Sequence, residues 1–348
     1  MSPEIKTMKA FAHLGIQLRD FCQKWNDGAG DARPEFKNAV ELAGAANPWF
    51  VKENILLALG QWGEILTEEN LREFLSNHSP KTGLPQKTVG IVMAGNVPLV
   101  GFHDFLCVLL SGHRALAKLS SQDRHLMPFL ASILVEAEPS LSQRIQFVED
   151  IMKGYDAVIA TGSNNTGRYF EHYFGKGPHI IRKNRNSVAI LSGNESQGEL
   201  KALGLDIFSY FGLGCRNVSK IFVPKGYDFD LFFKGIQGYG DVVNHFKYAN
   251  NYDYNRAVFL MNGQQFLDNG FLLLKEEEEL SSPISVLHFS QYDSGTDPRV
   301  GLAALEGQIQ CIVSGSGLNG EIPFGQAQNP ALADYADGVD TMEFLLAL

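Results

Sequence analysis

The sequence predicts an α/β protein built on a parallel, doubly wound sheet. Between residues 88 and 191, short apolar stretches typical of strands alternate with helical patterns at the spacing of this fold class. The chain has 348 residues, more than one small hydrophobic core usually serves, so we expect two domains. A mostly helical stretch precedes the alternating pattern, and a second strand-rich stretch follows it.

The first half divides into a helical region and a series of strands. Residues 3–78 repeat apolar side chains mostly at helical spacing, and Thr67, followed by Glu69 and Asn70, is a typical helix start. The turn-rich residues 79–85 form the expected boundary. Beyond it we expect strands at 89–94, 114–119, 146–148, 157–160 and 188–191, with helices at 99–110 and about 123–136.

The second half begins after Ser192. A helical pattern leads to a turn at Cys215, and residues 218–223 are typical of a strand that stops at Pro224. Helices are expected at 229–237 and 264–275, and strands at 284–289 and 309–313. Cys311 alternates with apolar neighbours in the last strand, so we interpret it as a core residue.

Composition and charge exclude several function classes. The net charge of −10 argues against general nucleic-acid binding. The four cysteines are far apart and lack metal-site spacing, so neither a zinc site nor a disulfide framework is expected. The N-terminus lacks the apolar core of a signal peptide, and no apolar run reaches membrane-spanning length. The cytoplasm is therefore the expected location.

Cys215 is the first candidate for chemistry. It lies at a helix-to-strand junction, after Gly212 and Gly214, where small residues let a ligand approach the sulfur. The neighbouring cation of Arg216 would favour the thiolate, which is the nucleophilic form. A buried structural cysteine explains the same pattern equally well.

Three turns that follow predicted strands are further candidates. Open parallel sheets bind ligands at the carboxyl ends of their strands. Asn96, in the turn 95–98, can donate to a developing oxyanion, and the turn 118–121 can hold a ribose or a phosphate. The turn 161–167 opens a helix whose N-terminus favours phosphate, although it is neither GxGxxG nor a P-loop. Each turn taken alone is also an ordinary polar loop.

The order of these segments resembles the aldehyde dehydrogenase superfamily over most of the chain. Residues 89–98 are similar to its Val-Gly-x-x-x-x-x-Asn-x-Pro segment, and 161–167 to its Thr-Gly-Ser-x-x-x-Gly turn. Residues 118–120 resemble Lys-Pro-Ser with Leu119 in place of Pro. Gly214-Cys215 resembles the segment of the catalytic cysteine. Residues 279–284 resemble Glu-x-Phe-Gly-Pro-Val with two serines in place of Phe and Gly, and 323–325 match Pro-Phe-Gly.

The resemblance implies a fold and a domain organisation. The fold would be aldehyde-dehydrogenase-like, with two domains that each contain a mainly parallel sheet, one a Rossmann-like cofactor domain and one catalytic. Residues 1–191 would form the helical arm and the NAD(P)-binding domain. Residues 192–313 would form the catalytic domain, and residues 314–348 would return to the cofactor domain or to a dimer interface.

The resemblance also implies roles for individual residues. Cys215 would be the nucleophile, and Asn96 with the Cys215 backbone N–H would form the oxyanion hole. Glu279 would reach the nicotinamide ribose, with the register among Glu276–Glu279 left open. The remaining cofactor contacts would be Lys118 and Ser120 at the adenosine ribose or its phosphate, and Gly162 and Ser163 beside the pyrophosphate and the nicotinamide.

One departure narrows the activity. Aldehyde-oxidising members carry Glu-Leu-Gly-Gly where this chain has residues 181–187, which contain no carboxylate. Since that Glu activates water in the hydrolytic step, an acyl-cysteine here should await another partner, either coenzyme A or hydride. The cations Arg182, Lys183 and Arg185 could meet a phosphorylated ligand or form a solvated strand edge. With this departure and the segments 47–50 and 336–340, the chain resembles the LuxC-like acyl-CoA reductases.

The implied reaction is reduction of a fatty acyl-CoA thioester to the aldehyde through an acyl-Cys215 intermediate. The hydride donor would be NADPH or NADH, with NADPH slightly favoured. The acyl donor would be a coenzyme A or acyl-carrier thioester, and the assembly a homodimer or higher homo-oligomer. Two alternatives stay open: an NAD(P)-dependent aldehyde dehydrogenase, and a non-catalytic nucleotide-binding member of the fold. The presence of Asn96 and Cys215 argues against the second.

Overall fold

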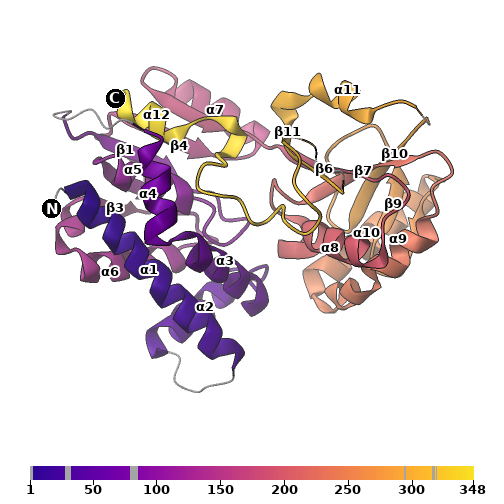
Figure 1. Ribbon diagram of the computed structural model, residues 1–348, viewed down its shortest axis with the longest axis horizontal. Helices are drawn as coiled ribbons and strands as arrows, with labels where there is room; N and C mark the ends of the chain where they lie inside the picture. The colour runs from indigo at the N-terminus through magenta and orange to yellow at the C-terminus, as the bar shows by residue number, and fades with distance from the viewer. Residues whose placement is uncertain (1–2, 28–32, 79–84, 294, 316–317, 319) are drawn as a thin grey trace. The chain divides into compact units, whose positions relative to one another are not determined.

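The chain forms two compact units, each described here by itself. The structure is a computed structural model that describes residues 3–27, 33–78, 85–293, 295–315, 318 and 320–348 (Figure 1). Unit 1 contains the residues up to Lys183 together with Ala331–Leu348, and unit 2 contains Asn184–Pro330. The turn predicted at 79–85 lies, apart from its last residue, outside the described residues.

The N-terminal part of unit 1 is helical, as predicted. Its helices are α1 (Pro3–Asn26), α2 (Pro34–Ala46), α3 (Lys52–Ile65) and α4 (Glu68–Ser76). Thr67 caps α4, because its side chain accepts a hydrogen bond from the backbone N–H of Asn70.

A five-stranded parallel sheet forms the centre of unit 1. Its order is β3-β2-β1-β4-β5, which confirms the Rossmann-like arrangement. The helix predicted from Leu99 begins three residues later, because Leu99 has a positive φ of 63° that ends the preceding turn. The elements are β1 (Thr88–Val92), α5 (Phe102–Leu110), β2 (Arg114–Lys118), α6 (Leu126–Ala137), η1 (Pro139–Gln143), β3 (Ile145–Val148), β4 (Ala157–Thr161), α7 (Asn164–Phe174) and β5 (His179–Arg182).

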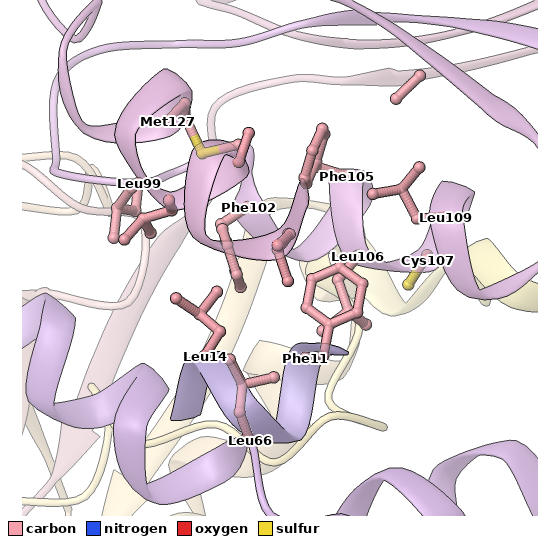
Figure 2. Close-up of a cluster of buried hydrophobic side chains, with 14 of the residues drawn as sticks. Phe11, Leu14, Leu66, Leu99, Phe102, Phe105, Leu106, Cys107, Leu109 and Met127 are labelled. Atoms are coloured by element: carbon pink, nitrogen blue, oxygen red, sulfur yellow. The ribbon is translucent and has the colours of Figure 1, made fainter. Parts of the chain in front are cut away.

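Helix α5 is the centre of the unit 1 core. All its residues except His103 are buried, and Figure 2 shows Phe102 and Phe105 on this helix among side chains of α1, with Phe11 and Leu14. The rings of Phe11 and Phe102 meet edge to face with centroids 6.1 Å apart. Each such side chain contributes about 1.5–3 kcal/mol when it is buried. The helical arm is therefore an integral part of the core.

Unit 2 contains a six-stranded sheet of order β11-β6-β7-β10-β9-β8, parallel except for β8. Its first elements are β6 (Asn186–Ile190), α8 (Gln197–Phe208), η2 (Ser209–Gly212), β7 (Val218–Pro224), α9 (Phe229–Ile236), η3 (Gln237–Asn244) and α10 (Phe246–Met261). They are followed by β8 (Leu267–Asp268), β9 (Leu273–Glu276), β10 (Val286–Tyr292), α11 (Pro298–Ala303), η4 (Glu306–Gln308) and β11 (Ile309–Ser314).

The structure corrects two of the predicted elements. The strand predicted at 188–191 was placed with the first sheet, but β6 pairs with β7 and β11 and belongs to unit 2. The helix predicted at 264–275 is wrong, since this stretch forms β8 and β9. The run Phe271–Leu274 is completely buried, and a continuous apolar run fits a buried strand as well as a helix.

The C-terminal residues from Ala331 onward pack in unit 1 as η5 (Ala336–Gly338) and α12 (Thr341–Leu346), which contacts α5. Arg182 is only 3% exposed and bonds to Asp104 at 2.8 Å. It also donates to the Ala336 carbonyl at 2.5 Å and to the Thr341 hydroxyl at 2.8 Å. Burial alone would lower the pKa of Arg182, but the Asp104 carboxylate outweighs it and raises that pKa.

This ion pair gives a stability prediction. Asp104→Asn leaves the buried Arg182 guanidinium without its counter-charge, so we expect a loss of about 3–5 kcal/mol in the free energy of unfolding. The matched control is Asp20→Asn, which removes the exposed Asp20–Lys24 pair and should change stability by less than about 1 kcal/mol. Urea unfolding of both variants measures the difference, and equal effects would contradict the structural role of Asp104.

Candidate active site

Cys215 lies in an irregular turn between η2 and β7 and is exposed. The chain reaches this turn through three consecutive left-handed residues, Tyr210, Phe211 and Gly212, with φ of 54°, 58° and 77°. Left-handed backbone costs a residue with a side chain roughly 1–2 kcal/mol. Two aromatic residues in this conformation therefore need surrounding interactions that hold them there.

Asn217 supplies part of that support. It is 3% exposed, and its Oδ1 accepts a hydrogen bond from the Gly214 backbone N–H at 2.8 Å. Its Nδ2 donates to the carbonyl of Asp206 at 3.1 Å and to that of Ser209 at 2.8 Å. One side chain thus connects the end of α8, the start of the left-handed stretch and the residue before Cys215.

A second contact fixes Cys215 itself. The hydroxyl of Ser187, in β6, donates to the Cys215 carbonyl at 2.8 Å. The same oxygen lies 3.0 Å from the sulfur of Cys311, in β11. Cys311 is buried as predicted, and it takes part in this polar contact in addition to apolar packing.

A third contact joins the turn to the Pro-Phe-Gly segment. The carboxylate of Asp206 is fully buried in α8 and accepts the backbone N–H of Gly325 at 2.6 Å and of Ala327 at 2.9 Å. Arg216, next to Cys215, bonds to the same segment, because its Nε donates to the Ala327 carbonyl at 2.5 Å. Arg216, expected to favour the thiolate, is thus also a structural link. Burial raises the pKa of Asp206 to about 6, although both N–H donors oppose this shift.

The carboxyl edge of the unit 1 sheet holds most of the residues expected to bind a cofactor. Asn96 is exposed in the turn that follows β1, and the buried Asn47 donates to the preceding carbonyl of Gly95 at 3.2 Å. Lys118 ends β2 and donates to the Asp150 carbonyl at 3.0 Å. A side chain on Gly95 would come within 2.4 Å of the Ser120 oxygen, so the turns after β1 and β2 are in direct contact.

The third turn connects β4 to α7 at the same edge, since β4 pairs with β1. Ser163 caps α7 by accepting the Thr166 backbone N–H at 3.2 Å. A Cβ on Gly162 would lie 2.9 Å from the Phe170 ring, so any larger residue there would require that ring to move. The free N–H groups and the dipole at the N-terminus of α7 are compatible with a phosphate group.

Glu279 is exposed in the connection from β9 to β10, in unit 2. Its backbone carbonyl accepts a hydrogen bond from His288 Nδ1 at 3.0 Å. Glu277 forms an ion pair with Lys275 at 2.9 Å, whereas Gln291 lies 3.5 Å from the Glu276 carboxylate. The predicted site residues thus fall into two groups, with Cys215 and Glu279 in unit 2 and the others in unit 1.

The structure separates the three cations at 182–185, for which the sequence left a phosphate site and a solvated strand edge open. Arg182 is buried against Asp104, Lys183 pairs with Glu171 at 2.8 Å, and Arg185 donates to the carbonyl of Ile309 at 3.2 Å. Neither the phosphate hypothesis nor a solvated edge describes Arg182, because its charge is neutralised inside unit 1.

Sequence reasoning missed several residues that build the turn. Asp206 lies three residues after Leu203, on the apolar face of α8. A charged residue at a position where the helical pattern predicts burial could have identified it. Asn217 had no such signal, since asparagine is common in turns. Lys220 follows the turn within a mostly apolar strand and is 1% exposed, which is unusual for lysine.

The fold is that of the aldehyde dehydrogenases. The aldehyde dehydrogenase of Mycobacterium tuberculosis complexed with NAD+ matches with a TM-score of 0.61 and 14% identity, over 90% of this chain and 74% of that one. Aldehyde dehydrogenase 21 from Physcomitrella patens, in complex with the reaction product succinate, matches with a TM-score of 0.62 and 13% identity, over 98% and 84%. At such low identity the likeness establishes the fold alone.

The family follows from the sequence. The acyl-CoA reductase (LuxC) family matches residues 34–230, more than half of the chain, including Cys215. The chain belongs to this family and is an oxidoreductase of the acyl-CoA reductase type. No curated protein matches the sequence. In the part of the chain that the structure describes, no helix is long and apolar enough to cross a membrane.

The Asn217 contacts give a second stability prediction. Asn217→Ala removes three hydrogen bonds and leaves their backbone partners unsatisfied, so we expect unfolding free energy to fall by about 3 kcal/mol. Asn244→Ala is the control, because Asn244 is exposed and bonds only to the nearby Asp241 in the contacts described, and it should change stability by less than about 0.5 kcal/mol. If urea unfolding shows an equally small loss of unfolding free energy for Asn217→Ala, the three hydrogen bonds of Asn217 do not stabilise the turn as we describe.

The buried carboxylate gives a pH prediction. Because the native pKa of Asp206 is raised from 3.8 to about 6, its protonated form is favoured in the folded state. The stabilisation that the folded state gains from protonated Asp206 is fully present below pH 3.8 and is lost as the pH rises through 6. The change corresponds to roughly 3 kcal/mol. Asp206→Asn cannot ionise, so its stability relative to wild type should rise between pH 4 and pH 7; a constant difference would contradict the raised pKa.

Proposed function

We propose that this protein reduces acyl-CoA thioesters to aldehydes through a covalent acyl-Cys215 intermediate. The observation that carries the proposal is the exposed Cys215 in a turn fixed by Asn217, Ser187 and Asp206, within the region that matches the acyl-CoA reductase family. Such a turn presents a nucleophile at a defined position without requiring the backbone to reorganise during the reaction.

In the first step, the Cys215 thiolate attacks the thioester carbonyl carbon. The bond from that carbon to the coenzyme A sulfur breaks, and coenzyme A leaves as a thiolate while the acyl group stays on Cys215. The Asn96 amide would donate to the oxyanion of the tetrahedral intermediate, together with the Cys215 backbone N–H. The exposed position of Asn96, in the turn that follows β1, supports this role.

In the second step, the acyl group on Cys215 accepts a hydride. A bound nicotinamide cofactor would supply that hydride. The residues at the unit 1 edge suit such a cofactor: Lys118 and Ser120 would hold the adenosine ribose or its phosphate, and Gly162 and Ser163 the region of the pyrophosphate. Glu279 would bind the nicotinamide ribose. The carbon–sulfur bond to Cys215 then breaks, which releases the aldehyde and the thiolate.

Two finer points belong to the same proposal. NADPH would be preferred to NADH, because the ammonium of Lys118 at the end of β2 could neutralise a 2′-phosphate. The acyl donor would be a thioester of coenzyme A or of a carrier protein. The assembly would be a homodimer, which is usual in the superfamily that the chain resembles.

The segment 181–187 supports reduction over oxidation. It contains no carboxylate that could activate water, and its cation Arg182 is committed to Asp104. The test is product analysis: wild type with acyl-CoA and NADPH or NADH should form aldehyde, and Cys215→Ala should form none. Rapid conversion of aldehydes to acids with the oxidised cofactor, and no reduction of acyl-CoA, would favour the aldehyde dehydrogenase alternative.

Asn96→Ala gives a quantitative test of the oxyanion role. Removing one oxyanion donor typically slows such a step by about 10²- to 10³-fold. We expect this loss in the single-turnover release of coenzyme A without cofactor. Asn77→Ala is the control, since Asn77 is exposed at the end of α4, and its rate should equal that of wild type. An unchanged rate in Asn96→Ala would remove Asn96 from the mechanism.

A further inference from the structure

The connection from β9 to β10 has an unusual course. The two strands are parallel neighbours, with His288 paired to Lys275, yet only residues 277–285 join them. The chain leaves β9 at Glu276 and must return along the sheet to enter β10 at Val286, and it does so without a helix. Because irregular backbone has no ladder partners, its buried carbonyls need hydrogen bonds from elsewhere.

Side chains of the sheet supply those bonds to four consecutive carbonyls. The ammonium of Lys220 donates to the carbonyls of Glu277 at 2.7 Å and Glu278 at 2.8 Å. His288 Nδ1 donates to Glu279 at 3.0 Å, and the Ser219 hydroxyl donates to Leu280 at 2.7 Å. Because a carbonyl can only accept, the Nδ1 of His288 must carry its proton in this contact.

Lys220 is the costly member of this set. It lies in the central strand β7, paired with His288 in β10, and is only 1% exposed. Its ammonium also lies 5.1 Å from the centroid of the Phe222 ring. Burying an ammonium group is unfavourable unless its protons are bonded, and burial here lowers the pKa of Lys220. An apolar side chain at this position would avoid the free-energy cost of burying a charge. The presence of lysine therefore suggests that its bonds to the two carbonyls serve a purpose beyond packing.

The segment that Lys220 holds contains Glu279. Glu277 pairs with Lys275 and Glu276 lies 3.5 Å from Gln291, whereas Glu278 and Glu279 are both exposed. Of these two, Glu279 is the residue to which the proposed function assigns the ribose, and its carbonyl and those of both its neighbours accept hydrogen bonds. The same strand, β7, follows the Cys215 turn directly, with Lys220 five residues after Cys215. One strand therefore connects the nucleophile turn to the segment of the expected ribose ligand.

We propose that Lys220, with His288, is a positioning residue that fixes residues 277–280 so that Glu279 can bind the ribose of the nicotinamide cofactor. This inference rests on the proposed function of Glu279. It assigns Lys220 to the cofactor-dependent half of the reaction and excludes it from the acylation of Cys215, which needs no cofactor.

The test separates those two halves. Lys220→Met keeps the length and apolar stem of the side chain and removes the donors. We expect the Kd for NADPH, measured by fluorescence titration, to rise at least about 10-fold, as losing one hydrogen bond to a charged group would produce. Acylation of Cys215 by acyl-CoA without cofactor, followed by intact-protein mass spectrometry, should stay within about 2-fold of wild type.

Three further variants complete the design. Lys220→Arg retains donors and should restore part of the affinity. His288→Phe removes only the donor to Glu279 and gives a second test if Lys220→Met does not fold. Lys225→Met is the control, because Lys225 is exposed just after the same strand and pairs with Asp293; its Kd should equal that of wild type.

Glu279→Gln distinguishes the possible failures. If this variant binds NADPH like wild type while Cys215 still acylates, the role of Glu279 is wrong and the inference falls with it. If Glu279→Gln weakens binding but Lys220→Met and His288→Phe do not, only the inference is overturned. Equal losses of acylation and cofactor affinity in Lys220→Met would also overturn it, because they would indicate general support of the unit.

Discussion

The candidate site depends on one physical constraint: irregular backbone that is partly buried lacks the hydrogen bonds that backbone groups exchange within helices and sheets, so it must bond to side chains instead. Unit 2 meets this constraint with buried polar side chains. Asn217 bonds three backbone groups around the Cys215 turn, Asp206 bonds the N–H groups of Gly325 and Ala327, and Lys220 bonds two carbonyls in the segment of Glu279. A buried polar group that is fully bonded also selects one conformation, since any other leaves it unsatisfied.

The two units meet different demands. Unit 1 packs a helical arm and the C-terminal residues around α5, and polar turns follow three adjacent strands of its parallel sheet. The geometry of such an edge comes from the sheet itself, so short turns suffice. In unit 2 the proposed nucleophile, Cys215, follows two left-handed aromatic residues, and the turn that carries it is held by side chains from β6, the turn itself and α8. Strain at this place is consistent with a reactive group held in one orientation.

Much of this could be predicted from the sequence, and the reasons are physical. Strands such as 157–160 are short apolar runs that end in polar turns, so the pattern predicted both the strands and the sheet edge at which those turns lie. The predicted helix at 264–275 failed because Phe271–Leu274 is a continuous apolar run, which has no period to distinguish helix from strand. β5 was missed, since residues 179–182 form a short edge strand whose cation turns inward to Asp104.

The contacts of Asn217 and Lys220 lay beyond sequence reasoning for a different reason. Each bonds backbone groups of segments that only the folded chain brings near, and a side chain's type does not indicate which carbonyl it will reach. The glutamate run illustrates this limit: four consecutive glutamates are equivalent in the sequence, whereas the structure pairs Glu277 with Lys275 and leaves Glu278 and Glu279 exposed on a hydrogen-bonded backbone.

The most direct test of the account is to trap the covalent intermediate. Wild-type protein and Cys215→Ala are mixed with a panel of acyl-CoAs of different chain length, without cofactor, and their intact masses are measured. The account predicts that wild type gains one acyl mass, that the variant gains none, and that NADPH or NADH removes the adduct with release of aldehyde. If no acyl-CoA forms an adduct with wild type, and no aldehyde does so with the oxidised cofactor, then Cys215 is not the nucleophile and the proposed mechanism is wrong.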